Sequence, residues 1–480
     1  MGKLKRLAGE TILYGFGSII PRFLNFLLVR LHTAVFVPEE YGIITKLFAY
    51  VAVINTIFMF GMETAYFRFA NKEGADEKRI FNITQTVVLI ISGLCSILLI
   101  AFAQPVASYL DIPSRPDLVI WLVVLMFIDA AVAIPFAQLR FYKKALTFAA
   151  GKILNVAILV FLNVFFLKLM NGDGSADVGF VVLANLIANA FYILLLAPTL
   201  WRWRPAFDKQ ITPAVFEYSF PIMLTGLAGI TNEMFSRITL ERWLPEGFYG
   251  KSTDYALGIF GAAYKFAVLM NLAIQGFRYA AEPFFFSNAS EKNSPQLFAK
   301  INHYFVIVCC LLLLSVSINL DILKHFLAKP EYWEGLYIVP ILLLAYLFLG
   351  VYYNFSVWFK LSDRTYYGTF ITILGAIITI VANYVLIPMA GYEGSAWAAL
   401  ICYFVMTMLC YALGKKFYPI PYDLTKMFGY IIVTTLLCYG VNKIEIPNQW
   451  LATGFHIAVI LAWIAIVYLI ERKNLVTKRA

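Results

Sequence analysis

Apolar runs of about twenty residues alternate with short polar segments along almost the whole chain. A helix needs about 20 predominantly apolar residues to cross the hydrocarbon core of a bilayer, so each run predicts one spanning helix. Fourteen such helices are expected, at 10–36, 43–67, 81–104, 117–138, 146–168, 178–201, 213–237, 256–282, 298–320, 336–358, 366–388, 391–413, 422–441 and 450–470. The pattern therefore predicts an all-α polytopic membrane protein whose chain ends on the side where it starts.

The layout of the first half returns in the second half. The matched pairs, at offsets that grow from 207 to 220, are Glu10 with Glu217, Asn25 with Asn232, Arg30 with Arg237, Gly42 with Gly261, Lys46 with Lys265, Glu63 with Glu282, Arg140 with Lys360 and Asn163 with Asn383. Because only 14% of the residues are charged, these matches favour an internal repeat. Six-helix units start and end on one side, so the repeats must be parallel, with a shared cavity between them. We expect six-helix lobes at 1–205 and 206–416, and two further helices at 417–480.

Composition excludes several classes of protein. With 61% hydrophobic and 17% aromatic residues, the chain is too apolar for a soluble domain. The net charge of +10 does not indicate a nucleic-acid partner, because the basic residues are spread between apolar segments rather than clustered. The six cysteines lie inside apolar segments without metal-ligand spacing, so neither a disulfide nor a metal site is expected.

The basic residues also predict orientation, because Lys and Arg in short loops mark the cytoplasmic side. With the N-terminus inside, the cytoplasmic segments hold 24 Lys and Arg residues and the outside loops hold 7. We therefore expect both termini in the cytoplasm. The apolar run after the first six residues has no small-residue cleavage pattern, which predicts a retained first span rather than a removed signal peptide.

Seven cations fall inside the expected spans. They are Arg22, Arg30, Lys46, Lys152, Arg237, Lys265 and Arg278. Each would cost about 3 kcal/mol at the bilayer centre if it faced lipid, which sums to on the order of 20 kcal/mol. Most of these side chains must therefore line a polar cavity or reach toward the membrane surface.

Two of the cations share the first span and can share a cavity. Eight residues separate Arg22 from Arg30, a helical rotation of about 800° that leaves them about 80° apart. The second lobe offers Arg237 and Lys265 opposite them, and Lys46 lies in the second span. Guanidinium and ammonium groups in a cleft of low dielectric constant suit a phosphate-bearing anion and would repel a cationic drug. These five residues form the candidate phosphate site.

Four carboxylates lie at or within membrane depth and are candidates for ion coupling: Glu63, Asp129, Glu233 and Glu282. Each could instead be a counter-ion for a neighbouring cation, and the sequence leaves both roles open. Only Asp129 and Glu233 are deep, so ion pairing alone does not account for the buried cations.

Short motifs over the whole length resemble one membrane protein family. They are Pro38-Glu39-Glu40-Tyr41-Gly42, Phe60-Gly61-Met62-Glu63-Thr64-Ala65 with Arg68, Pro135-Phe136-Ala137-Gln138-Leu139-Arg140, Tyr264-Lys265, Pro340-Ile341-Leu342-Leu343 and Gly391-Tyr392-Glu393-Gly394-Ser395-Ala396-Trp397. In this order they resemble the polysaccharide or O-antigen flippases of the multidrug/oligosaccharidyl-lipid/polysaccharide exporter superfamily. In the related lipid II flippases, cations on the first, second and eighth spans contact pyrophosphate, which points here to Arg22, Lys46 and Lys265. Many relatives carry Asp before the seventh-span Arg, where this chain has Ser236.

The resemblance implies that an undecaprenyl-pyrophosphate-linked oligosaccharide is moved from the inner to the outer leaflet of a bacterial cytoplasmic membrane. It implies alternating access driven by an H⁺ or Na⁺ gradient or by the membrane potential, without a cofactor or catalytic residues. Membrane lipids would surround the protein, and a polysaccharide polymerase and glycosyltransferases of the same pathway are candidate partners. The two last helices would form a groove for the lipid tail, or else only enlarge the bundle.

Two other classes of function compete with this interpretation. A multidrug or organic-ion antiporter of the same superfamily would need a carboxylate-rich cavity. A membrane polysaccharide polymerase or acyltransferase would bring a substantial outside loop or a catalytic His/Asp cluster, and the sequence has neither. We therefore expect a transporter that is not an enzyme.

The orientation can be checked by labelling. In intact cells, Lys251→Cys and Asn448→Cys should react with a membrane-impermeant thiol reagent, because their loops are expected outside. Lys209→Cys and Lys478→Cys should stay unlabelled until the cells are opened. The reverse labelling pattern would contradict the orientation.

Overall fold

The computed structural model describes residues 20–170, 176–289, 291 and 293–476, and within these residues the chain forms helices and no β-strand. Twelve helices in this part of the chain are long and apolar enough to cross a membrane. One of them, α15, contains two spans, and residues 20–35 form a further helix ahead of the twelve. The described residues thus contain thirteen of the predicted spans and residues 20–35 of the first, whose residues 10–19 lie outside the described part of the chain. The all-α polytopic fold is confirmed.

The first lobe contains the helical residues 20–35 and the elements that follow them. These are α2 (Pro38–Met59), α3 (Met62–Ala70), α4 (Glu77–Ala101), α5 (Ala103–Tyr109), α6 (Pro116–Phe141), α7 (Ala145–Val164), the π-helix η1 (Phe165–Met170) and α8 (Gly179–Arg202). Proline opens α2 and α6, where its missing N–H has no intrahelical partner in any case. Between α2 and α3, Phe60 and Gly61 take positive φ angles, which interrupts the second span without ending it.

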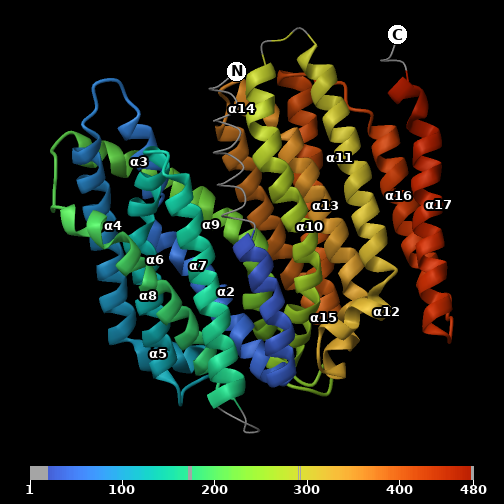
Figure 1. Cartoon of the computed structure of the whole chain (residues 1–480), viewed down its shortest axis with the longest axis horizontal. Coiled ribbons are helices and arrows are strands. Elements are labelled where there is room, and N and C mark those ends of the chain that lie inside the picture. Colours follow the sequence, from blue (N-terminus) through green and yellow to red (C-terminus); the bar gives the residue numbers. More distant parts are fainter. Residues whose placement is uncertain (1–19, 171–175, 290, 292, 477–480) are drawn as a thin grey trace.

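The second lobe repeats this plan. Its elements are α9 (Ile211–Trp243), α10 (Thr253–Asn288), α11 (Ser294–Ser317), α12 (Leu320–Leu323), the 3₁₀ turns η2 (Lys324–Phe326) and η3 (Pro330–Ile338), α13 (Val339–Phe355), α14 (Val357–Leu361) and α15 (Tyr366–Phe417). In Figure 1 the first lobe, blue to green, lies beside the second, yellow to orange, with α2 and α9 between them.

Gly391 divides α15 into the two spans expected at 366–388 and 391–413. Its φ of 58° and ψ of −135° are not helical, and a residue with a side chain adopts such angles only with strain. A Cβ at this position would also lie 2.0 Å from the hydroxyl oxygen of Tyr249. The backbone N–H of Tyr392 donates to the same hydroxyl at 3.1 Å, so the loop before α10 holds the break.

The internal repeat is visible in matching ion pairs. In the first lobe, Arg140 Nη2 lies 2.6 Å from Glu63 Oε1, and in the second, Lys360 Nζ lies 2.7 Å from Glu282 Oε1. Both partners of one pair correspond to the partners of the other in the sequence repeat. Two lobes of the same ancestral layout explain this agreement.

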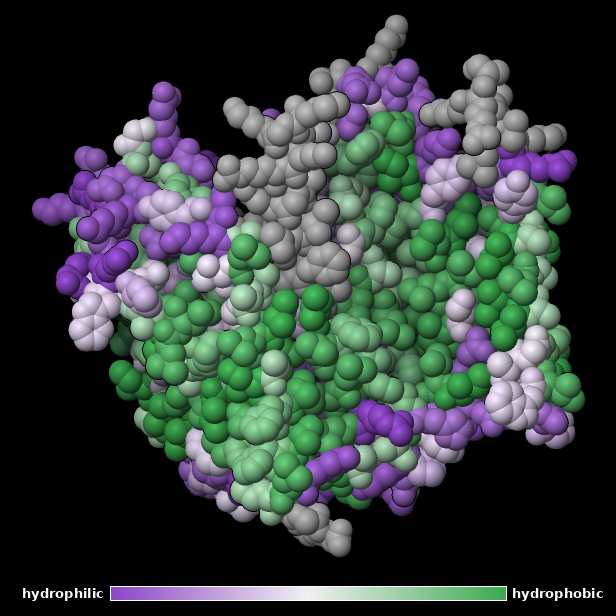
Figure 2. Space-filling model, viewed as in Figure 1, coloured by the Kyte–Doolittle hydropathy of each residue, from purple (hydrophilic) through white to green (hydrophobic). Residues whose placement is uncertain are grey.

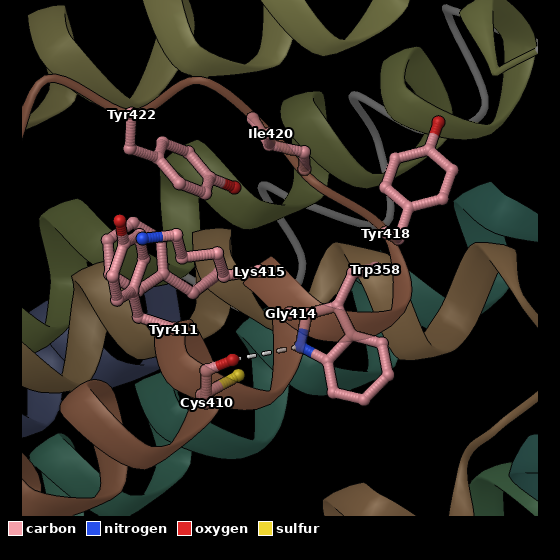
Figure 3. Close-up of a pocket in the computed structure, with 9 residues that line it drawn as sticks. Trp358, Cys410, Tyr411, Gly414, Lys415, Tyr418, Ile420 and Tyr422 are labelled. Carbon is pink, nitrogen blue, oxygen red and sulfur yellow. Dashed lines mark hydrogen bonds between the residues drawn. The ribbon is translucent and has the colours of Figure 1, made fainter.

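The two last helices, α16 (Leu424–Val441) and α17 (Gln449–Val476), pack against α11. The segment that leads into α16 is anchored by aromatic packing around a cavity of only about 10 Å³, shown in Figure 3. There Trp358 Nε1 donates to the carbonyl oxygen of Cys410 at 3.1 Å, and Tyr422 lies against Phe355. Trp358 is fully buried, so its role is packing.

The outer surface agrees with a membrane environment. Figure 2 shows hydrophobic residues across the middle of the molecule and hydrophilic residues gathered toward its two ends. Exposed aliphatic side chains such as Leu194 and Leu461 belong to this apolar band. A band of this kind is stable only in contact with lipid, so the chain is a multi-pass membrane protein.

Candidate functional site

A cavity of about 350 Å³ lies between the two lobes. Its walls come from residues 20–35, α2, α7 and α8 of the first lobe and from α9 and α10 of the second. The lining combines apolar side chains with almost as many polar and charged ones. The charged ones are Glu233, Arg237 and Lys265.

The cavity has more positive than negative charge. Arg237 on α9 and Lys265 on α10 are near enough for their charges to repel each other, and among the described residues neither forms an ion pair. Arg237 rests on Tyr264, with its guanidinium carbon 4.0 Å from the ring centroid. Glu233, one helical turn before Arg237, is the only carboxylate in the described lining. Two unpaired cations beside one carboxylate in an enclosed site form an anion-binding arrangement.

The first helix presents one face to this cavity. Asn25, Val29 and His32 line it at spacings of four and three residues, which keeps them on one side of a helix. His32 Nε2 donates to Asn163 Oδ1 at 2.9 Å, so its ring is held in place. Arg22 lies one turn before Asn25 on the same side, and its charge acts on Tyr353 of α13. Arg22 is exposed and does not line the cavity.

Arg30 does not line the cavity in this structure. Its Nη1 donates to the carbonyl oxygen of His325 at 2.6 Å. Two neighbouring bonds join the same segments, because Ala328 N donates to Thr33 Oγ1 and Lys329 Nζ donates to the carbonyl oxygen of Val35. The rotation of about 80° between Arg22 and Arg30 permits a shared cavity, but here it turns Arg30 toward the η2–η3 segment.

Lys46 also lies outside the cavity, in a buried ion cluster. Its side chain is 0% exposed, and Nζ lies 2.6 Å from Glu241 Oε1 and 3.1 Å from Asp254 Oδ1. Glu241 ends up buried because α9 runs on to Trp243, beyond the span expected at 213–237. The sequence analysis therefore counted too few deep carboxylates. Lys46, which it assigned to the candidate phosphate site, has two carboxylate partners in this structure.

The ion cluster sits where the lobes touch backbone to backbone. A Cβ on Gly42 of α2 would lie 2.0 Å from the carbonyl oxygen of Asp254, and one on Gly258 of α10 would lie 1.9 Å from that of Pro38. Only glycine allows helices to approach this closely. We call this end of the interface, with Lys46, Glu241 and Asp254, the closed end. Toward the opposite end, the ribbons of the two lobes diverge (Figure 1).

The four candidate coupling carboxylates are not brought together. Glu63 is paired with Arg140, and Glu282 with Lys360 and Arg278, so both are counter-ions here. Asp129 lies inside the first lobe, where Asn189 Nδ2 donates to it at 2.8 Å. Glu233 alone faces the interlobe cavity. Among the described residues, no group of three or more His, Cys, Asp or Glu residues could hold a metal ion.

An apolar groove runs along α13, the second half of α15 and α16. It consists of two adjoining hollows of about 420 and 490 Å³ that share Leu344, Trp397, Leu400 and Thr435. The sequence predicted a groove made by the two last helices, but α17 contributes no residue to these walls. Whether a lipid tail occupies the groove stays a prediction.

A family model identifies the protein family of this chain. The model described as polysaccharide biosynthesis protein matches residues 7–289, more than half of the chain. The chain belongs to this polysaccharide biosynthesis family. A search of curated protein sequences finds no significant match.

Two solved structures of transport proteins share the fold of this chain. The structure titled lipid II flippase MurJ, inward closed conformation, matches with a TM-score of 0.75 at 13% identity, over 95% of this chain and 99% of that chain. An inward-facing multidrug resistance MATE transporter of the MOP superfamily matches with a TM-score of 0.63 at 14% identity, over 88% and 99%. At these identities the likeness shows the fold and leaves the substrate open.

The sequence analysis missed some residues of the interlobe cavity and of the ion cluster. Asn25 and His32 carried no assigned role in binding, although their spacing with Val29 marks one face of the first helix. Asn185 on α8 was not singled out, although Asn189 follows it at a spacing of four residues and marks one polar face of the span. Glu241 could be found only by knowing that it meets Lys46, 195 residues away.

The ion cluster at the closed end gives a stability prediction. Lys46→Met should lower the free energy of unfolding by about 3 to 5 kcal/mol, because removing one partner of a buried pair leaves carboxylates without compensation. Thermal and denaturant unfolding of the purified protein in detergent would measure it. Lys443→Met, at an exposed lysine, is the control and should change stability by less than about 0.5 kcal/mol.

The triple variant Lys46→Met/Glu241→Gln/Asp254→Asn should recover most of the lost stability, since no uncompensated charge remains. Equal stability of Lys46→Met and the control would show that the cluster does not hold the lobes together.

Proposed function

We propose that this protein flips an oligosaccharide linked through pyrophosphate to a polyprenyl lipid, such as undecaprenol, from the inner to the outer leaflet of the bacterial cytoplasmic membrane. The observation that carries the proposal is the interlobe cavity, where Arg237 and Lys265 form no ion pair with a carboxylate among the described residues. Membership of the polysaccharide biosynthesis family and the flippase-like fold support it.

The cavity chemistry suits the pyrophosphate linker. The planar guanidinium of Arg237 can bind two phosphate oxygens at once, and Lys265 adds a point charge from the neighbouring helix. Arg22 and Asn25 extend the polar face of the first helix toward the diverging end of the lobes. A volume of about 350 Å³ is that of a small-ligand site, so the linker and the first sugar fit while the rest of the glycan extends out.

The lobe interface supports alternating access. Polar contacts between the lobes concentrate at the closed end, around Lys46 and around Arg30. Release on the other side of the membrane requires these contacts to separate while each lobe keeps its internal ion pair. We propose that the closed end faces outside, with both chain termini in the cytoplasm.

Coupling to an H⁺ or Na⁺ gradient is assigned to Asp129 or Glu233. Among the four candidates, only these two form no ion pair within the described residues, whereas Glu63 and Glu282 are neutralised by basic partners. Asp129 is half-buried and lies within electrostatic range of Lys152. A proton or cation arriving at such a site changes its charge balance, which is what a coupled transporter requires.

A multidrug antiporter is the second candidate function, favoured by Glu233 in the cavity and by the fold of MATE transporters. A cationic drug would have to approach Arg237 and Lys265 as well. One carboxylate against two cations gives the cavity the wrong sign for that substrate.

Binding measurements test the proposed substrate. Arg237→Ala or Lys265→Ala should weaken binding of purified polyprenyl-pyrophosphate-linked oligosaccharide about ten- to hundredfold, since each contact to a charged group is worth about 1.5 to 3 kcal/mol. Arg237→Lys should recover part of the affinity, and Arg237→Gln should not. Arg30→Ala is the matched control, because that arginine binds a backbone carbonyl outside the cavity.

Normal substrate binding by the Arg237 and Lys265 variants would refute an electrostatic phosphate site. High affinity for a cationic dye, lost in Glu233→Gln, would instead establish the multidrug function.

Coupling can be measured separately in vesicles that contain the purified protein and a short lipid-linked oligosaccharide. Asp129→Asn or Glu233→Gln should abolish the acceleration of flipping by an imposed H⁺ or Na⁺ gradient, because the titrating or cation-binding carboxylate is gone. Glu63→Gln and Glu282→Gln should keep that response. If all four variants respond like the unmodified protein, none of these carboxylates couples transport to an ion.

A further inference from the structure

The first lobe contains a second polar cavity, away from the interlobe site. Its volume is about 560 Å³, larger than that of the interlobe cavity. It lies where α4 begins, α6 ends and α8 ends, and three basic residues line it: Lys78 on α4, Lys144 in the turn before α7, and Arg202 at the end of α8. Figure 2 shows hydrophilic residues gathered over this end of the first lobe.

These three cations are not neutralised by the protein. The only carboxylate in the described lining is Glu77, and its oxygens accept from Tyr66 Oη at 2.5 Å, Tyr142 Oη at 2.5 Å and Gln138 Nε2 at 3.0 Å. In the part of the chain that the structure describes, Lys78, Lys144 and Arg202 form no ion pair. The neighbouring Arg79, in contrast, is paired with Asp208. The cavity therefore has more positive than negative charge.

The N-terminus of α4 does not add to this potential, because the side chain of Asp76 at the N-cap accepts from Arg79 N and Glu77 occupies the first turn. Neutral donors complete the lining, among them Asn82 and Thr199. Cations and neutral donors around one space form an arrangement that binds phosphate groups.

The position of the cavity indicates where its ligand comes from. Trp201, next to Arg202, is 84% exposed, and Leu146, two residues after Lys144, is 72% exposed. An exposed Trp beside basic residues at helix ends is typical of the headgroup layer, and an exposed Leu beyond it faces the acyl chains. The cavity therefore lies at the depth of lipid phosphates.

We propose that this cavity binds the phosphate-bearing headgroup of an anionic membrane phospholipid, with Lys78, Lys144 and Arg202 as its charged contacts. Basic pockets between transmembrane helices bind anionic headgroups in this way. The bound lipid would tie α4, α6 and α8 together at the membrane surface. The site is independent of the lipid-linked substrate of the interlobe cavity.

Native mass spectrometry of the full-length protein with phosphatidylglycerol tests the proposal. Lys78→Ala, Lys144→Ala and Arg202→Ala should each weaken phosphatidylglycerol binding about fivefold, and the triple variant about a hundredfold. The matched control is Lys72→Ala/Lys209→Ala/Lys416→Ala, which removes the same charge from exposed residues outside the cavity. It should bind phosphatidylglycerol like the unmodified protein.

Four further measurements identify the ligand and the site. Phosphatidylcholine should bind equally weakly to all variants, and Lys144→Arg should bind phosphatidylglycerol normally. Millimolar inorganic phosphate should not displace the lipid, because the apolar surface beside the cavity contributes only to lipid binding. Arg237→Ala should leave phosphatidylglycerol binding unchanged, which separates this site from the transport cavity.

The proposal is overturned if the control triple loses as much lipid binding as the cavity triple, since the effect is then nonspecific. It is also overturned if inorganic phosphate displaces the lipid, which would mark a site for a soluble anion, or if Arg237→Ala removes the lipid. If the triple variant does not fold, the three single variants, each at an exposed side chain, give the same comparison.

Discussion

The contact between the lobes depends on burying the ammonium group of Lys46. A buried charge is stable only with partners, and among the described residues Lys46 pairs with Glu241 of α9 and Asp254 of α10, both in the other lobe. Gly42 and Gly258 make this possible, because they let the two backbones touch. Contact between the lobes at this end therefore also neutralises the lysine.

Basic residues at equivalent positions of the internal repeat have different roles in the two lobes. Lys46 and Lys265 occupy equivalent positions, as do Arg30 and Arg237, yet the first-lobe members hold the lobe interface while the second-lobe members face the cavity. The second lobe therefore supplies the basic side chains of the cavity, whereas the equivalent basic side chains of the first lobe form contacts between the lobes. The helices that carry the cavity cations, α9 and α10, also supply the partners of Lys46.

Each lobe is internally fixed. The pairs Glu63–Arg140 and Glu282–Lys360 join helices within one lobe, and they are equivalent in the two lobes. Half-exposed ion pairs contribute little to stability individually, but they orient the helix ends that they join.

Local chemistry in the sequence predicted the all-α polytopic fold, its spans and the division of α15 near Gly391, because bilayer thickness acts on each segment by itself. It also predicted a phosphate site that includes Arg237 and Lys265; the structure places both in one cavity, and their role in binding stays a prediction. Only the tertiary structure decided that Lys46 is neutralised and that Arg30 binds a backbone carbonyl. The partners of these two residues lie some two to three hundred residues away, where small changes in helix length and rotation decide which side chains meet.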